Sequence, residues 1–324
     1  MLRTGRTTGR GQAHAKVILF GEHAVVHGAA AVALPLGDLP IRATATWRDG
    51  PLTLASTLFT GPLAQAPALL EAPIAVVHAC LTAFDLPSEG IAIEVSGEIP
   101  AERGLGSSAA VAGALVTALA DLAGRELSEE EYLELVAVGE RVAHGRPSGL
   151  DARATAASGP LLFEAGAARV LASTLTGVLV VADSGVHGRT RQAVASVASF
   201  LERHPVRGAT LVAGLGALAH GGARDLTANR PRALGEKMST AQGMLRELGV
   251  SSQELDALVD AAVASGALGA KLTGGGQGGC IIALAEDELA AVRIDAAVRE
   301  AGAVATWWHR LGPVTPDNDR AETS

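Results

Sequence analysis

The residues best placed to do chemistry are two serines that follow a glycine-rich turn. Gly104, Leu105 and Gly106 lead into Ser107 and Ser108, and an apolar, alanine-rich segment follows. Glycines let backbone N–H groups close on an anion, and the start of a helix adds unpaired N–H donors and the positive end of its dipole. The run therefore indicates a polyphosphate site with serine hydroxyls near a bridging metal. The plainer alternative is an ordinary helix start with serine as its N-cap.

A second glycine-rich segment, residues 271–280, joins two short apolar strands and contains five glycines. Such a run lets backbone approach a ligand or another part of the chain, although a tight or flexible hairpin is the simpler interpretation. Neither glycine segment has the Walker A pattern or the dinucleotide-binding pattern of a strand, Gly-x-Gly-x-x-Gly and a helix. A bound nucleotide therefore needs a different phosphate cradle.

Glu140 lies on the apolar stripe of an expected helix, together with Leu133 and Val136. A carboxylate is costly there unless it is paired or binds a cation, and Mg²⁺ is a suitable cation. The alternative is that Glu140 reaches water at the helix end.

Two further charged residues could share a site with Glu140. Asp151 follows the turn 147–150, which could hold its carboxylate still or simply make it a helix cap. Lys16 lies in an apolar strand just before Gly21, Glu22 and His23, so it either points to solvent or forms a pocket wall.

The elements that must position these groups alternate between strand and helix. We expect strands at 15–20 and 91–95, a helix at 107–123 that stops at Gly124, and a second helix that begins with a capping box at Ser128. A domain boundary is expected near residue 176. A strand at 178–182, about three helices between 186 and 265, and a strand, glycine loop, strand, helix and strand ending near 308 follow. Residues 1–11 and the tail from residue 313 have the composition of frayed chain ends.

Composition limits the classes of partner. The 324 residues are 48% hydrophobic and 19% charged, which fits two globular domains, and the net charge of −8 argues against nucleic acid or an anionic membrane as a partner. Cys80 and Cys280 are far apart and favour reduced thiols in a cytoplasmic protein. No apolar run is long enough to cross a bilayer, and no signal peptide is evident.

Four segments resemble motifs of the GHMP small-molecule kinases, in the form found in mevalonate kinases. Residues 15–28, with Gly21-Glu22-His23, look like the first motif; residues 100–110 match the second and residues 271–280 the third. Residues 140–151 are similar to the segment that carries the catalytic aspartate. The matches lie in the family's order and extend from residue 14 to about 284.

The resemblance implies transfer of the γ-phosphoryl group of ATP to the primary 5-hydroxyl of mevalonate, with Mg²⁺ as cofactor, in isoprenoid biosynthesis. Residues 104–108 would bind the ATP phosphates, and Ser108 and Glu140 would ligate the metal. Asp151 would be the base or would orient the hydroxyl, and Lys16 would stabilise negative charge.

The substrate assignments also come from the resemblance. They comprise Lys16, Glu22, His23, Asp151, Phe163 and Gly275. This chain departs from the family pattern in having Ala13-His14-Ala15 before the lysine, Gly275 where alanine is usual, and Phe163 where tyrosine is frequent. The role of His14 stays open between nucleotide contact and packing.

The resemblance also implies an α+β fold of two domains: an N-terminal domain of the ribosomal-S5 type at 1–176 and a ferredoxin-like C-terminal domain at 177–312, with ATP and substrate between them. Residues 313–324 would be a disordered tail. A homodimer stays open. The alternatives are a GHMP kinase for another small alcohol and a non-catalytic, ligand-binding relative.

Overall fold

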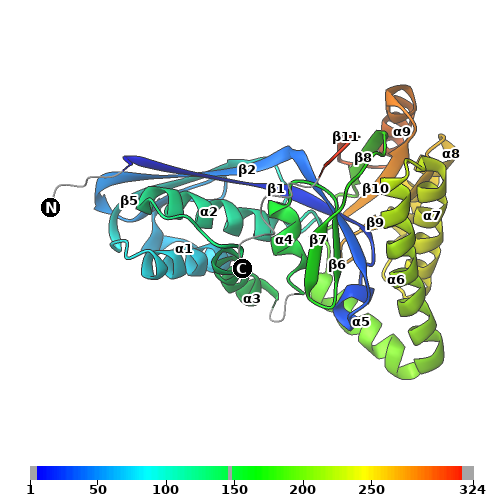
Figure 1. Cartoon of the computed structure of the whole chain (residues 1–324), viewed down its shortest axis with the longest axis horizontal. Helices are drawn as coiled ribbons and strands as arrows, with labels where there is room; N and C mark the ends of the chain where they lie inside the picture. Colours follow the sequence, from blue (N-terminus) through cyan, green and yellow to red (C-terminus); the bar gives the residue numbers. More distant parts are fainter. Residues whose placement is uncertain (1–5, 145–147, 316–324) are drawn as a thin grey trace. The chain divides into compact units, whose positions relative to one another are not determined.

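The computed structural model describes residues 6–144 and 148–315. Its contacts group the chain into two compact units that are assembled from separate stretches (Figure 1). Unit 1 comprises Met1–Ala15, Leu36–Ala101 and Gly106–Ala156; unit 2 comprises Lys16–Pro35, Glu102–Leu105 and Ala157–Ser324. The expected domain boundary near residue 176 divides the chain once along the sequence, and it stays a prediction. The expected disordered tail falls mainly on residues outside the described part, although Val314 pairs with Ser173 in an isolated bridge.

Unit 1 is built on a sheet whose strands are paired in the order β4, β3, β5, β2, with β1 also paired to β2. The bounds are β1 Thr8–Phe20, β2 Ala31–Pro51, β3 Thr53–Ala55, β4 Thr60–Pro62 and β5 Glu89–Gly97. Ile41, Ala43 and Ala45 of β2 are buried and alternate with more exposed residues, so one face of the sheet is apolar. The strands β1 and β2 continue into the residues assigned to unit 2.

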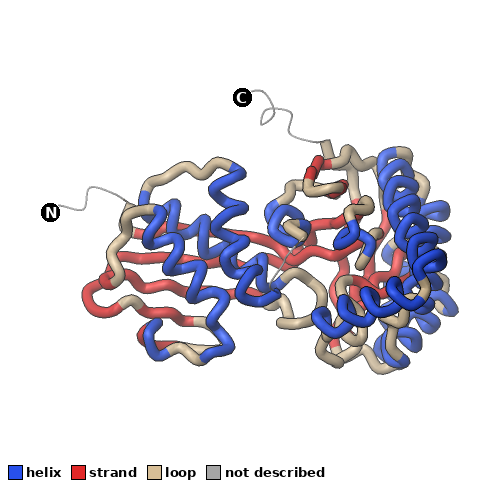
Figure 2. The backbone as a smooth tube through the Cα atoms, turned by 90° about the horizontal axis from the view of Figure 1, so that it is seen from below, coloured by secondary structure: helices blue, strands red, loops and turns tan. Residues whose placement is uncertain are grey.

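The helices α1 and α2 lie along that apolar face (Figure 1), and α3 packs against both of them. Figure 2 shows helices running across the strands of this part of the chain. The helices of unit 1 are α1 Glu71–Ala83, α2 Ser107–Ala123, α3 Glu129–His144 and α4 Leu150–Ala156, with short 3-10 turns at Leu63–Gln65 and Ala68–Leu70. The expected helix at 107–123 is confirmed, and it ends where Gly124 adopts a left-handed φ of 67°. The capping box is also confirmed: Ser128 Oγ accepts from Glu131 N at 3.1 Å, and Glu131 Oε2 accepts from Ser128 N at 3.0 Å.

The start of β1 corrects one expectation. Residues 8–11 are not a frayed end, because Gly9 and Gly11 lie directly under α2. A Cβ on either glycine would collide with the helix backbone, at the carbonyls of Ala118 and Ala114 respectively. The glycine content that resembled a chain end instead allows the helix to lie close to the strand.

Unit 2 contains a four-stranded antiparallel sheet with the order β11, β8, β10, β9. In chain order the elements run strand, helices, strand, strand, helix, strand, which is the ferredoxin-like pattern predicted for the C-terminal part. Figure 1 shows α7, α8 and α9 beside this sheet. The bounds are β8 Gly177–Asp183, β9 Gly269–Thr273, β10 Cys280–Ala285, β11 Ala305–Leu311, α5 Thr190–Arg203, α6 Pro205–Thr227, α7 Pro231–Glu247, α8 Gln253–Ala264 and α9 Glu288–Glu300.

The remaining strands of unit 2 are β6 Leu161–Glu164 and β7 Ala167–Val170, and a 3-10 turn spans Ala24–His27. Residues 31–33 of β2 pair with β6, which pairs in turn with β7. Within the described ranges, no helix has the length and apolar character needed to span a membrane.

Candidate functional site

Lys16 is a buried cation on the glycine-rich turn before α2. Its residue is 2% exposed, its backbone N–H donates to the Leu105 carbonyl at 2.9 Å, and its Nζ donates to the Gly104 carbonyl at 3.2 Å. Because the strand and the turn are joined at both the backbone and the side chain, the ammonium position is fixed. The alternative in which Lys16 points to solvent is therefore wrong.

The two glycine-rich segments meet in unit 2. A Cβ on Gly104 would lie 2.8 Å from the Thr273 carbonyl oxygen, and a Cβ on Gly274 would lie 2.7 Å from the Gly104 Cα. Both glycines also have positive φ, 79° and 81°. The third motif is therefore a packed loop whose glycines admit another backbone, and this decides between the two interpretations of residues 271–280 in favour of close approach.

The first motif is attached to the same loop through hydrogen bonds. Thr273 Oγ1 accepts from Ile18 N at 2.8 Å and donates to the Ile18 carbonyl at 3.2 Å. Lys271 Nζ pairs with the Glu22 carboxylate and donates to the Leu272 carbonyl at 2.6 Å. Parts of three of the four motifs found in the sequence thus converge in unit 2.

The Lys271–Glu22 pair has no exposed surface on either side chain. Burial raises the pKa of Glu22, and the nearby Lys271 charge opposes that effect. Burial likewise lowers the pKa of Lys271, opposed by Glu22. Since each charge compensates the burial of the other, removing one of the two side chains would leave the other charge buried without a partner.

His23 follows Glu22 in a left-handed conformation with φ of 60°. Its Nε2 lies 2.9 Å from the Gly275 carbonyl oxygen, which can only accept, so Nε2 carries the proton. Burial is the main cause that lowers the pKa of His23. The ring is therefore held neutral, with Nδ1 as its acceptor atom.

Phe163 lies in β6 opposite Ala31 of β2 and is 2% exposed. Its ring is part of the buried interior of unit 2. The same unit therefore holds the expected residues Lys16, Glu22, His23, Gly104, Leu105, Phe163 and Gly275.

The other expected residues lie in unit 1, where α2 begins. Gly106 is the N-cap in a left-handed conformation with φ of 71°, and no side chain caps the helix start. Ser107 and Ser108 form the first turn and are partly exposed. The alternative of a serine N-cap is thus wrong. No side chain caps the first N–H groups of α2, which is the arrangement that an anion-binding helix start needs.

Glu140 is 4% exposed on α3, so the alternative in which it reaches water at the helix end is wrong. Asp151 lies in the first turn of α4 and is partly exposed. The helices α2, α3 and α4 pack against one another within unit 1. Of the expected segment between Glu140 and Asp151, residues 145–147 lie outside the described residues.

Tyr132, the one tyrosine of the sequence, was not predicted to matter. Its hydroxyl bonds to the Thr155 side chain, and burial raises its pKa to about 12, with the Glu140 charge adding to the effect. A Cβ on Gly113 would collide with this hydroxyl. Thr155 Oγ1 in turn donates to the Asp151 carbonyl at 3.0 Å, so Tyr132 connects α2 and α3 to the start of α4.

His14 contacts a neighbour on its own strand. Its Nε2 accepts from the Gln12 amide at 2.9 Å, and burial followed by the Arg42 charge lowers its pKa. A nucleotide contact by His14 stays a prediction.

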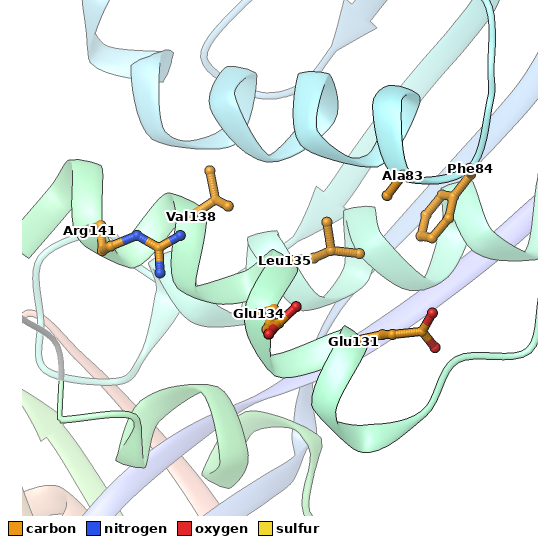
Figure 3. A pocket seen from close by; sticks show the side chains of 7 residues that line it. All are labelled: Ala83, Phe84, Glu131, Glu134, Leu135, Val138 and Arg141. Carbon is orange, nitrogen blue, oxygen red and sulfur yellow. The ribbon is translucent and has the colours of Figure 1, made fainter.

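A separate hollow of about 490 Å³ lies between α1 and α3 in unit 1 (Figure 3). None of the expected site residues lines it. Its lining residues are Ala83, Phe84, Glu131, Glu134, Leu135, Val138 and Arg141.

Known proteins resemble the chain along most of its length. The family model for the N-terminal domain of GHMP kinases matches residues 72–159, and that for the GHMP kinase C-terminal domain matches residues 223–304. Mevalonate kinase of Aeropyrum pernix is 34% identical over 291 residues, which cover 86% of this chain and 89% of that protein. Mevalonate kinase of Methanothermobacter thermautotrophicus is 35% identical over 272 residues, which cover 84% and 88%. The chain belongs to the mevalonate kinase family of the GHMP kinases.

The fold comparison agrees with membership of the mevalonate kinase family. The crystal structure of L. major mevalonate kinase in complex with R-mevalonate superimposes with a TM-score of 0.85 at 26% identity, covering 96% of this chain and 98% of that one. The predicted family and the two-domain α+β fold are both confirmed.

The residues that sequence analysis missed are Lys271 and Tyr132. A lysine inside an apolar strand was a usable signal, because the same pattern drew attention to Lys16. No sequence signal pairs Lys271 with Glu22, since 249 positions separate them.

Proposed function

We propose that this chain transfers the γ-phosphoryl group of ATP to the primary 5-hydroxyl of mevalonate, giving 5-phosphomevalonate and ADP. Its sequence identity of 34–35% to mevalonate kinases over most of its length supports this reaction. The structural observation that carries the proposal is the Lys16 ammonium, buried and bound to the carbonyl of Gly104 in the loop before α2. A fixed cation beside that loop suits a reaction that moves a phosphoryl group.

The phosphate-binding part comprises residues 104–108. No side chain caps the N–H groups at the start of α2, and these donors together with the positive end of the helix dipole would favour the ATP phosphates. Gly104 and Gly106 hold the turn with φ of 79° and 71°, so the N–H groups keep their direction. Binding by this loop needs no Walker A lysine, because Lys16 supplies the cation.

The residues present fit a magnesium ion carried by the nucleotide. Ser108 and Glu140 offer a hydroxyl and a carboxylate, which are the hard oxygen ligands that Mg²⁺ takes together with phosphate oxygens and water. Among the described residues there is no cluster of three or more His, Cys, Asp or Glu side chains for a metal held by protein alone. Bound Mg²⁺ would neutralise the charge that develops on the phosphates.

Asp151 and Lys16 are the catalytic residues of the proposal. The Asp151 carboxylate accepts the proton of the mevalonate 5-hydroxyl or orients that hydroxyl. The alcohol oxygen then bonds to the γ-phosphorus of ATP, and the bond between this phosphorus and the ADP oxygen breaks. Lys16 offsets negative charge on the phosphoryl group during the transfer.

The substrate residues proposed for mevalonate are Lys16, Glu22, His23, Asp151, Phe163 and Gly275. The neutral His23 ring supports this choice, because its Nδ1 can accept a hydrogen bond from a hydroxyl while Nε2 stays on Gly275. Glu22 acts through its buried pair with Lys271, which holds the turn that carries His23.

The cytoplasmic location is proposed on the two separate buried thiols, Cys80 and Cys280, which suit a reducing compartment. A homodimer stays an open prediction.

The experiment measures ADP release with a panel of small alcohols that includes mevalonate, galactose and phosphomevalonate. We expect ADP release with mevalonate and with none of the other compounds. ADP release with a different alcohol would show that this alcohol, and not mevalonate, is the substrate. MgATP binding without any ADP release would favour a non-catalytic relative.

Asp151→Asn tests the base within this experiment. The variant removes the charge and the proton acceptor but keeps the shape, so turnover should fall by about 10²-fold or more while the Kd for MgATP changes little. Asp49→Asn, at an exposed position on β2, is the matched control and should keep wild-type turnover. Wild-type turnover in Asp151→Asn would show that the assignment is wrong.

A further inference from the structure

A largely buried ion pair ties the segment Glu102–Leu105 to the end of β8. Arg103 Nε donates to Asp183 Oδ2 at 2.9 Å, and Arg103 Nη2 donates to the Gly185 carbonyl at 3.3 Å. The two side chains are 12% and 5% exposed. Asp183 Oδ1 accepts from Gly185 N at 2.8 Å, so the carboxylate and the turn that follows β8 bind the guanidinium as one rigid acceptor.

Backbone contacts reinforce the pair from both sides. Gly188 N donates to the Glu102 carbonyl at 2.8 Å, and Ser184 Oγ donates to the Gly279 carbonyl at 2.7 Å. A Cβ on Gly279 would lie 2.9 Å from the Arg103 carbonyl oxygen. The segment before α2, the turn after β8 and the third-motif loop therefore pack backbone against backbone.

Arg103 directly precedes the residues that carry the phosphate-binding donors. Gly104, the next residue, accepts from Lys16 Nζ, and Gly106 is the N-cap of α2. Because each residue adds only two soft backbone dihedrals, an anchor at Arg103 restricts the direction of the N–H groups that follow it.

We propose that Arg103 and Asp183 are positioning residues for ATP: their largely buried pair sets the conformation of the phosphate-binding loop without touching the nucleotide. This inference rests on the proposed kinase function and adds the turn after β8 to the parts of the molecule that determine nucleotide affinity.

A second contact between the same two segments provides a control. His187 Nδ1 lies 3.1 Å from Glu102 Oε2, in a pair that is charged only when the histidine is protonated, and these side chains are 69% and 65% exposed. Exposed pairs contribute little because water screens them, whereas removing one partner of a buried pair leaves a desolvated charge. Comparing the two contacts therefore separates the effect of the Arg103–Asp183 pair from that of an exposed contact between the same segments.

The experiment measures the Kd for MgATP by calorimetry without an acceptor, and then KM for ATP, KM for mevalonate and kcat. Arg103→Met and Asp183→Asn should each raise the Kd and KM for MgATP roughly tenfold, while KM for mevalonate stays within about twofold. The double variant should be no worse than the poorer single variant, because both changes remove the same pair. Arg103→Lys, which keeps the charge but not the fork of donors, should fall between wild type and Arg103→Met. Glu102→Gln should match wild type in all constants.

An unchanged Kd for MgATP in folded Asp183→Asn, with only a lower melting temperature, would overturn the inference, since that result is what a purely structural pair gives. Should Arg103→Met not fold, Asp183→Asn and Arg103→Lys decide the question. A wild-type protein that binds MgATP but does not phosphorylate mevalonate would contradict mevalonate as the substrate, whereas the Kd for MgATP would still test the Arg103–Asp183 inference. A wild-type protein that does not bind MgATP would overturn both the proposed function and this inference.

Discussion

The two glycine-rich segments have similar compositions and touch each other at Gly104 and Gly274, but their surroundings differ beyond that contact. The segment before α2 ends in an uncapped helix start with partly exposed serines. In the loop between β9 and β10, Gly274, Gly276 and Gly278 are buried, and a Cβ on each would press on a neighbouring backbone. A glycine run therefore shows that something approaches the backbone closely. Whether a ligand or the chain itself approaches is decided by the neighbours.

This comparison predicts that changes at the packed positions of the third-motif loop, Lys271 and Gly276, act on stability, whereas changes at the start of α2 act on activity. Each prediction below can break that division or sharpen it.

The largest effect is expected for Lys271→Met. It leaves the Glu22 carboxylate buried without its cation, which should cost about 3–5 kcal/mol in the free energy of unfolding. Urea unfolding measures the loss. Arg232→Met, which removes an exposed pair with Glu286, is the control and should change stability little. The double variant Lys271→Met with Glu22→Leu should recover part of the loss, and a single variant as stable as wild type would contradict the role of the pair.

Gly276→Ala should cost about 1–3 kcal/mol beyond the cost of a left-handed alanine, because its Cβ would overlap the Val250 carbonyl oxygen. Gly249 provides the control: its φ of 75° nearly equals the 76° of Gly276, but nothing lies within 4 Å of its Cβ. The difference in unfolding free energy between the two alanine variants isolates the backbone contact. Equal losses would mean that conformation alone explains the third-motif glycines.

Ser108→Ala should lower kcat/KM by roughly tenfold or more and weaken the response to Mg²⁺, because one oxygen ligand is lost. The melting temperature should stay near the wild-type value, since Ser108 is partly exposed and caps nothing. Ser96→Ala, on the exposed part of β5, is the control. A loss of stability without a loss of activity would reverse the division between the two segments.

The smallest effect concerns pH. Burial lowers the pKa of His23, so below its ordinary value of 6.5 the unfolded chain takes up a proton that the folded chain does not. Stability should therefore fall as pH drops below 6.5, by at most about 1.4 kcal/mol per pH unit for this proton. His23→Gln, which keeps a donor for the Gly275 carbonyl, should reduce that slope, whereas the contribution of His14 is common to both proteins. Identical slopes in urea titrations from pH 7 to 5 would contradict the assignment.

Local signals predicted the elements around α2 and α3 well. A capping box and a helix-ending glycine act within a few residues, so Ser128 and Gly124 were readable from the sequence. The 21-residue strand β2 was not predicted, because Pro35, Gly37 and Pro40 inside it resemble turn residues. Pairing with the neighbouring strands overrides those local preferences.

The sequence predicted those residues of the candidate site that belong to the family motifs. The sequence pointed to Lys16, Ser108, Glu140 and Asp151, but burial decided that Lys16 and Glu140 do not reach solvent. The pairs Lys271–Glu22 and Arg103–Asp183 could not be predicted, because they join residues 249 and 80 positions apart. Such long-range pairs depend on the fold and leave no spacing pattern.

The packing of Tyr132 over Gly113 has an optical consequence. Because the chain has no other tyrosine and burial holds this pKa at about 12, tyrosinate absorbance near pH 11 reports whether α3 has separated from α2 and α4. Tyr132 is thus an intrinsic spectroscopic probe of local opening beside α4, the helix that contains Asp151.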